Sequence, residues 1–288
     1  MDFILDAIND WMQSLLIDGI MGNVNGMFDT INSEVTNAAN NVGMTPSDWN
    51  SGVFSLIQNL SDTVIMPIAG MILTFVMCYE LIQMIIDRNN LHDFPPSDIF
   101  KWIMKTSIAI LLVTNTFPMI MAIFDVSQAV VDSSAGIIIG DTSISTDMLD
   151  GFETALESEN LGYLLGLYIQ SSLVSVGMQI LSICIFIIIF GRMLEIYLMT
   201  SLGAIPMATL QSKEWNLGQN YIKSILALAF QAFLIMICLA IYAVLVQSIV
   251  TSGDPIDAIW TCVGYTVLLC FTLFKTATIS KTIFNAHG

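Results

Sequence analysis

The sequence predicts an all-α, polytopic membrane protein with about five spans, a re-entrant or interfacial hairpin and an amphipathic N-terminal region. Of its 288 residues, 55% are hydrophobic and 11% are charged, whereas a soluble globular domain carries about 25% charged residues. Apolar runs of about 20 residues, the length that a helix needs to cross the hydrocarbon core, recur along the chain. The composition excludes an ordinary soluble enzyme. The length of the runs excludes an outer-membrane barrel, whose strands alternate over about 10 residues.

Residues 1–62 are predicted to form an amphipathic helical region outside the cytoplasm. Apolar residues recur at the spacing of one helix face: Ile4, Ile8, Trp11, Met12 and Leu15. Asp18 and Gly19 are expected to end this helix. The stretch Thr45-Pro46-Ser47-Asp48 is typical of a new helix start, with Thr45 as N-cap. The first twenty residues hold four aspartates and no base, so we expect no cleavable signal peptide.

Residues 63–124 are predicted to form a hairpin of two spans, about 63–86 and about 102–124, the second bent at Pro118. Glu80 lies in the first span, about two turns from its end. A carboxylate at membrane depth is costly and indicates a function. The alternative, which we favour, is a structural carboxylate that reaches the headgroups or pairs with a base.

Residues 125–161 form a predicted acidic segment outside the cytoplasm, and a long span over 162–190 follows. Gly162 and Gly166 form a G-x-x-x-G pattern, which favours close helix packing in lipid. Serines and a glutamine recur at helical spacing after them: Ser171, Ser175, Gln179 and Ser182. Packing is the preferred interpretation of this face, and a pore lining is the alternative.

The second part of region 162–211 is predicted to be a hairpin that does not cross the membrane. Segment 193–211 is short and is broken by Gly203 and Pro206, as in a re-entrant or interfacial turn. Arg192 and Glu195 are three residues apart near its start and can form an ion pair on a helix. A boundary ion pair is the simpler interpretation, and a gating or docking role is the alternative.

Residues 212–288 are predicted to contain the last two spans and a cytoplasmic tail. Because Lys and Arg collect on the cytoplasmic side of membrane proteins, the eight bases indicate the orientation of the chain. All of them lie inside if the N-terminus is outside, 193–211 does not cross and the C-terminus is cytoplasmic. The outer segments then hold 18 of the 24 acidic residues. A crossing by 193–211 would give six spans instead.

No pattern in the sequence predicts catalysis, a cofactor or a metal. The chain has two histidines and five cysteines. It contains no H-E-x-x-H, G-x-S-x-G, P-loop or dinucleotide-binding motif. The cysteines lie in apolar runs without a C-x-x-C pair, so we interpret them as packing residues. We therefore expect a protein that is not an enzyme.

Five stretches carry a resemblance to a known family: MDFILDAINDWMQSLL, TPSDWNSGVFSLIQNLSDTVIMPIAG, DRNNLHDF, FKWIMKTSIAILLVTNT and GRMLEIYLMTSLGAIPMATL. With these stretches the chain resembles the TrbL-like inner-membrane subunit of conjugative type IV secretion systems, in the version carried by integrative conjugative elements of Gram-positive bacteria. The resemblance implies an outer N-terminal region, about five spans and a cytoplasmic C-terminus, in agreement with the charge pattern.

The resemblance also implies a non-enzymatic scaffold or channel subunit that helps to form the translocation path for a DNA–protein substrate. Its implied partners are other secretion-system subunits, separate ATPases, further copies in a homo-oligomeric ring, membrane lipids and single-stranded DNA in transit. The residues alone leave an alternative, a stand-alone membrane channel or small-solute transporter, which rests on Glu80 and the polar face of the third span.

Overall fold

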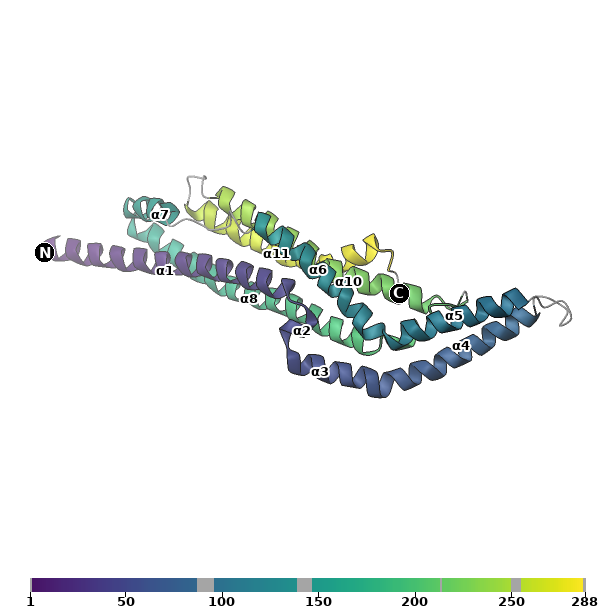
Figure 1. Ribbon diagram of the computed structural model, residues 1–288. Helices are drawn as coiled ribbons and strands as arrows, with labels where there is room; N and C mark the ends of the chain where they lie inside the picture. The colour runs from purple at the N-terminus through teal and green to yellow at the C-terminus, as the bar shows by residue number, and fades with distance from the viewer. Residues whose placement is uncertain (1, 87–95, 139–146, 213, 250–254, 287–288) are drawn as a thin grey trace. The chain divides into compact units, whose positions relative to one another are not determined.

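The computed structural model describes residues 2–86, 96–138, 147–212, 214–249 and 255–286 (Figure 1). Throughout these ranges the regular structure is helical, and the predicted all-α class is confirmed. The helices are α1 Asp2–Gly43, α2 Pro46–Trp49, α3 Ser51–Leu60, the π-helical η1 Ser61–Ile65, α4 Met66–Ile86, α5 Pro96–Thr114, α6 Thr116–Ile138, α7 Asp147–Glu157, α8 Leu161–Ser201, α9 Ala204–Met207, α10 Leu217–Ile249 and α11 Pro255–Ile283.

Within the described residues, four helical stretches are long and apolar enough to cross a membrane: Ser51–Ile86, Leu161–Ser201, Leu217–Val246 and Trp260–Ile283. The pair α5 and α6 can form a fifth, broken span, because together they pass the same test. This upper number agrees with the predicted five spans. Residues 193–201 continue α8 and form no crossing of their own, so the six-span alternative has no separate helix at this position.

The first span contains a π-helical turn where the sequence places a proline. Pro67 has no N–H, and its ring would clash with the carbonyl of Thr63 in a regular α-helix. The chain widens over η1 instead, where the backbone N–H of Met66 donates to the carbonyl of Ser61. A wider turn relieves the proline without ending the helix, and Figure 1 shows the bend between α3 and α4.

The second span bends at Asn115 and not at Pro118, where the bend was predicted. The axes of α5 and α6 differ by 66°, and the side-chain Nδ2 of Asn115 donates to the carbonyl of Leu111 over 2.8 Å. Pro118 is the third residue of α6. The N–H groups of a first helical turn have no intrahelical acceptor, so a proline there costs little.

The chain forms two compact units, each described here by itself. Unit 1 comprises residues 1–42, 131–189 and 234–276, and unit 2 comprises residues 43–130, 190–233 and 277–288. In unit 1, α1 lies alongside α8 (Figure 1). Its core contains large apolar side chains that are fully buried: Ile20, Leu156, Leu164, Leu167, Ile235, Met236, Leu239 and Leu273.

Helix α1 continues far beyond its predicted end at Asp18 and Gly19. A glycine inside a helix costs only about 1 kcal/mol relative to alanine, and Gly19 has a packing role. A Cβ atom there would lie 2.6 Å from the ring of Tyr168. The predicted apolar face is exposed at Ile8, Trp11 and Leu15, and the side chain of Ile4 lies outside the described residues. Buried residues occupy another face: Ile17, Ile20, Val24 and Met27.

In unit 2 the short helix α9 contacts α4, α5 and η1, next to the turn that joins α8 to α10. One apolar cluster fills this unit, with side chains such as Leu73, Val113, Ile196, Met207 and Ile225. The predicted hairpin over 193–211 is therefore the end of α8 followed by a compact turn. Of the predicted acidic segment 125–161, residues 139–146 lie outside the described residues, while the flanking parts belong to α6 and α7.

Candidate functional site

Polar side chains of α1 form hydrogen bonds with α8 and the residues just before it. Near the start of α1, Gln13 Nε2 donates to the carbonyls of Glu157 and Glu159, over 3.1 and 3.2 Å. Further along α1, Asn23 Nδ2 donates to Ser171 Oγ over 3.0 Å and to Ser172 Oγ over 2.9 Å. Both partners advance together along the sequence, so α1 and α8 run parallel.

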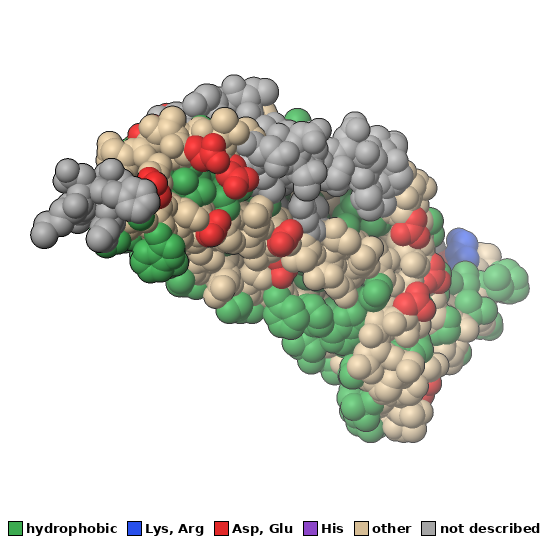
Figure 2. Space-filling model, turned by 90° about the vertical axis from the view of Figure 1, so that its left-hand side faces the viewer, with side chains coloured by type: hydrophobic (Ala, Val, Ile, Leu, Met, Phe, Trp, Pro, Cys, Tyr) green, Lys and Arg blue, Asp and Glu red, His purple; other side chains and the backbone are tan. Residues whose placement is uncertain are grey.

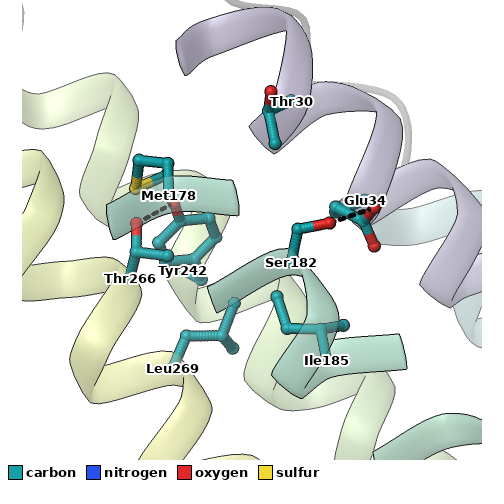
Figure 3. Close-up of a pocket in the computed structure, with 8 residues that line it drawn as sticks. All are labelled: Thr30, Glu34, Met178, Ser182, Ile185, Tyr242, Thr266 and Leu269. Atoms are coloured by element: carbon teal, nitrogen blue, oxygen red, sulfur yellow. Dashed lines mark hydrogen bonds between the residues drawn. The ribbon is translucent and has the colours of Figure 1, made fainter. Parts of the chain in front are cut away.

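A third contact of this kind lies beside a small cavity in unit 1 (Figure 3). Ser182 Oγ donates to the Glu34 carboxylate over 2.6 Å. In the same view Tyr242 and Thr266 share a hydrogen bond between their hydroxyl groups, over 2.6 Å. The cavity between these pairs measures about 10 Å³, which is roughly the space of one water molecule. Apolar side chains complete its lining: Met178, Ile185 and Leu269.

These contacts indicate which residues of the third span serve helix packing. Ser171 is buried and Ser182 is half-buried, and both bond to α1, whereas Gln179 is exposed. The packing interpretation therefore has direct support at two of the predicted positions. Asn23 and Glu34 were not predicted as partners of α8, because only the tertiary fold brings them close to it.

Gly162 and Gly166 lie on α8, and among the described residues no other helix approaches either glycine closely. A Cβ atom at Gly166 would meet nothing within 4 Å, and one at Gly162 would meet only the side chain of Asn160, at 3.4 Å. Close approach occurs at other glycines. A Cβ atom at Gly218 would lie 2.6 Å from the backbone of Leu210. The G-x-x-x-G face remains available for a contact with a second chain.

Glu80 pairs with Lys105 across the hairpin of α4 and α5 in unit 2. Their side chains keep only 17% and 28% of their surface exposed, so the pair is largely withdrawn from solvent. Trp102 also joins α5 to α4 near this pair, because its Nε1 donates to the carbonyl of Met77 over 3.1 Å. The structure thus shows Glu80 as a carboxylate with a basic partner, which is the interpretation that the sequence favoured.

An open pocket of about 410 Å³ lies beside this ion pair. Helix α4 contributes Tyr79 and Glu80, α5 contributes Lys101 and Lys105, and the segment before α10 contributes Glu214. Lys101 also contacts Asp98, at 3.2 Å, while 76% of its side chain stays exposed. The described lining of the pocket therefore combines two bases and two acids with the aromatic side chains of Tyr79 and Trp102.

Arg192 is buried in unit 2, with 5% of its surface exposed. Its Nε donates to the carbonyl of Leu228 over 3.3 Å, and its Nη2 to that of Ala229 over 3.5 Å. Ser127 donates to the same Ala229 carbonyl, over 2.6 Å. Among the described residues no carboxylate lies within ion-pair distance of Arg192. The Arg192 guanidinium therefore links α8 to α10 by donating hydrogen bonds to backbone carbonyl oxygens of α10.

Glu195 pairs with Lys281 of α11, at 3.2 Å, and not with Arg192 as its spacing predicted. Residues three apart on a helix can meet, but Arg192 points into the core while Glu195 stays 42% exposed on its side chain. Pro206 lies within α9, where its carbonyl accepts from Thr209. It shapes the turn between α8 and α10.

Within the described residues no three His, Cys, Asp or Glu side chains gather as metal ligands would. The geometry instead defines a multi-pass helical membrane protein held by polar interhelical contacts and a few charged clusters. A family model described as TrbL/VirB6 plasmid conjugal transfer like protein matches residues 31–204. This match covers more than half of the chain, which therefore belongs to the TrbL/VirB6 conjugal transfer family. Comparison with curated proteins and with solved structures found no match.

Proposed function

We propose that this chain is a non-enzymatic subunit of a conjugative type IV secretion system, of the kind carried by integrative conjugative elements of Gram-positive bacteria. In this role it helps to form the path through the cytoplasmic membrane for a DNA–protein substrate, while separate ATPases supply the energy. The observation that carries the proposal is the family match over residues 31–204. It covers the described parts of α3 to α8, in which the first spans lie.

The proposed assembly is a homo-oligomeric ring, supported by the apolar surface that one chain leaves uncovered. In the most apolar windows of Ser51–Ile86 and Leu161–Ser201, 22% of the residues are buried, compared with 50% in Leu217–Val246. The window in α10 is thus the most buried of the three, and the other two leave apolar surface that lipid or neighbouring subunits can cover. Gly162 and Gly166 lie on one of these surfaces and fit a close helix contact.

The proposed orientation has the N-terminus outside and the C-terminus in the cytoplasm. Seven of the eight bases belong to unit 2, and bases near span ends favour the cytoplasmic side. Single cysteines replacing Ser145 and Asn216, in a protein without its native cysteines, test this orientation. An impermeant maleimide should label Ser145→Cys in intact cells and Asn216→Cys only after permeabilisation. Labelling of both from outside would contradict the orientation.

A scaffold and a transporter should respond in opposite ways to changes in the Glu80–Lys105 pair and in the Gly162 and Gly166 pair. A scaffold needs the Glu80–Lys105 pair only for packing, so the reversed pair Glu80→Lys/Lys105→Glu should retain conjugation within a few-fold of the parent. Gly162→Leu/Gly166→Leu leaves every charge in place but would keep apart the helices of neighbouring subunits that the proposed ring brings together at these glycines. This second variant should lose oligomer and conjugation together.

The measurements are conjugation frequency and native-gel mass, with membrane levels compared by immunoblot. The single variant Glu80→Gln is the control for the reversal, because it leaves Lys105 without its acid and should cost about 1 kcal/mol. A coupling carboxylate would give the reverse order, with transfer abolished by the charge reversal and unaffected by the two leucines. That order would reject the scaffold in favour of a small-solute transporter.

A further inference from the structure

The pocket beside the Glu80–Lys105 pair lies where a phospholipid headgroup would lie. Glu80 is six residues before the end of the first span at Ile86, which corresponds to about 9 Å along the helix. Two of its aromatic side chains, Tyr79 and Trp102, belong to the residue types enriched at the membrane–water interface. Ser51–Ile86 is long and apolar enough to cross a membrane, and a position this close to its end corresponds to the polar–apolar boundary of a bilayer.

The described residues that line the pocket carry two bases and two acids. Lys101 and Lys105 come from α5, whereas Glu80 and Glu214 come from α4 and from the segment before α10. Lys105 is engaged by Glu80. Lys101 forms an ion pair with Asp98 at 3.2 Å, but its ammonium stays accessible because 76% of its side chain is exposed. Glu214 is exposed as well. Among the described residues that line the pocket, Lys101 thus offers an accessible ammonium and Glu214 an accessible carboxylate.

The helices that form the pocket also expose apolar side chains. Phe75 and Ile82 of α4 are 60% and 54% exposed, and Ile103 of α5 is 48% exposed. Phe75 contacts the ring of Trp215, next to Glu214, with 6.1 Å between the ring centres. This surface suits acyl chains, and a soluble anion or a free phosphate would leave it uncovered.

We propose that this pocket binds the headgroup of a zwitterionic phospholipid of the phosphatidylethanolamine type, with the phosphate at Lys101 and the ammonium at Glu214. The charge pattern selects this class. An anionic headgroup without an ammonium group would leave Glu214 unpaired beside added negative charge, whereas a phosphate and an ammonium match the two accessible charges. The inference does not depend on the proposed role in conjugation.

Native mass spectrometry of the full chain in mild detergent tests the proposal, by titration with phosphatidylethanolamine, phosphatidylcholine and phosphatidylglycerol of identical acyl chains. Phosphatidylethanolamine should bind tightest, because phosphatidylcholine lacks N–H donors for Glu214 and phosphatidylglycerol lacks the ammonium. Lys101→Gln and Glu214→Gln should each weaken phosphatidylethanolamine binding about five- to tenfold. Excess inorganic phosphate should not displace the lipid.

Two control variants separate the pocket from general effects of charge and folding. Lys101→Arg keeps the base and should keep the affinity within about twofold of the parent. Lys275→Gln removes an exposed base on α11 that does not line the pocket, and it should also leave the affinity unchanged. Equal loss in Lys275→Gln would overturn the proposal. So would unchanged binding in both pocket variants, as expected if the pocket accepts a peptide, or tighter binding of phosphatidylglycerol.

Discussion

Unit 1 contains 15 of the 24 acidic residues and one of the eight bases, whereas unit 2 contains the other nine acids and seven bases. Their net charges are thus −14 and −2 of the total −16. On the face shown in Figure 2, acidic side chains stand among exposed apolar ones, and Lys or Arg is visible only at its margin. The difference follows the sequence, because all the bases except Lys275 fall in the segments that form unit 2.

The two units also differ in how their helices are joined. In unit 1 the contacts between described helices include amides and hydroxyls, as in the bonds from Asn23 to Ser171 and Ser172, and the carboxylate of Glu34. In unit 2 charged groups join α4 to α5, α8 to α11 and α8 to α10. Neutral interhelical hydrogen bonds in membranes contribute about 0.6 kcal/mol on average, whereas a buried charge that loses its partners costs several. Unit 2 should therefore be more sensitive to single polar substitutions.

The largest effect is expected from Arg192→Glu in unit 2. In the parent protein the carbonyls of Leu228 and Ala229 accept hydrogen bonds from Arg192. A buried carboxylate in its place would donate nothing to them and would face them as a second acceptor. The cost should be about 3–5 kcal/mol, enough to reduce the amount of folded protein in the membrane. Fluorescence-detected gel filtration of the solubilised protein would measure the loss.

Arg192→Lys and Arg192→Met distinguish charge from packing at this position. Lysine keeps the charge but not the fork of donors, so it should give an intermediate loss. Methionine removes the charge and fills similar space, and buried charges replaced in this way are often neutral or stabilising. A parental melting temperature for Arg192→Glu would show that unit 2 does not rely on this charge.

An intermediate effect is expected from Gly218→Ala at the start of α10. The added Cβ would lie 2.6 Å from the Cα of Leu210 and 2.7 Å from the carbonyl oxygen of Pro206, both of them backbone atoms. Overpacking of this kind costs about 1–3 kcal/mol. Gly166→Ala is the matched control in unit 1, where nothing lies within 4 Å, and it should raise stability by up to about 1 kcal/mol. Equal melting temperatures for the two variants would contradict the close backbone contact between Gly218 and Leu210.

The smallest effect is expected from Asn23→Ala in unit 1. This change removes the donor to Ser171 and Ser172 and should cost about 0.5–1 kcal/mol. Asn25→Ala is its control, because the described part of the chain shows no hydrogen bond from the Asn25 side chain. Thermal unfolding in detergent would compare the two. A loss at Asn23 as large as that of Arg192→Glu would remove the distinction between the units.

The sequence predicted the spans well because apolar length alone decides whether a helix can cross a membrane. It failed where two local signals competed with tertiary packing. Gly19 was expected to end α1, but its contact with Tyr168 comes from a residue nearly 150 positions away. Pro118 was expected to bend the second span, yet a first-turn proline is compatible with a straight helix, and the break falls at Asn115.

The sequence pointed to individual charged residues such as Glu80 and Glu195, but it did not predict which side chains they pair with. Glu80 was singled out as a carboxylate that could pair with a base, and the structure places Lys105 beside it, a residue that the sequence did not identify as the partner. The partner of Glu195 was predicted wrongly, because helical spacing shows only that two side chains can meet and not which of them points into the core. The hydrogen bonds of Asn23 and Glu34 to α8 join residues 148 positions apart, and no local pattern reports them.

The π-helical turn at Ser61–Ile65 sets the helical phase between α3 and α4. A π-turn amounts to one residue added to an α-helix, and each added residue rotates everything before it by about 100°. The side chains of Val53, Phe54 and Ile57 pack against the core of unit 2 at the phase that results, with Phe54 against the ring of Phe117. Deleting Thr63 would restore a regular helix but turn that face away by more than a quarter of a rotation. A single-residue deletion or insertion here is therefore a larger perturbation than most substitutions. Homologous chains that lack this extra residue should present a different face of the preceding helix to the core.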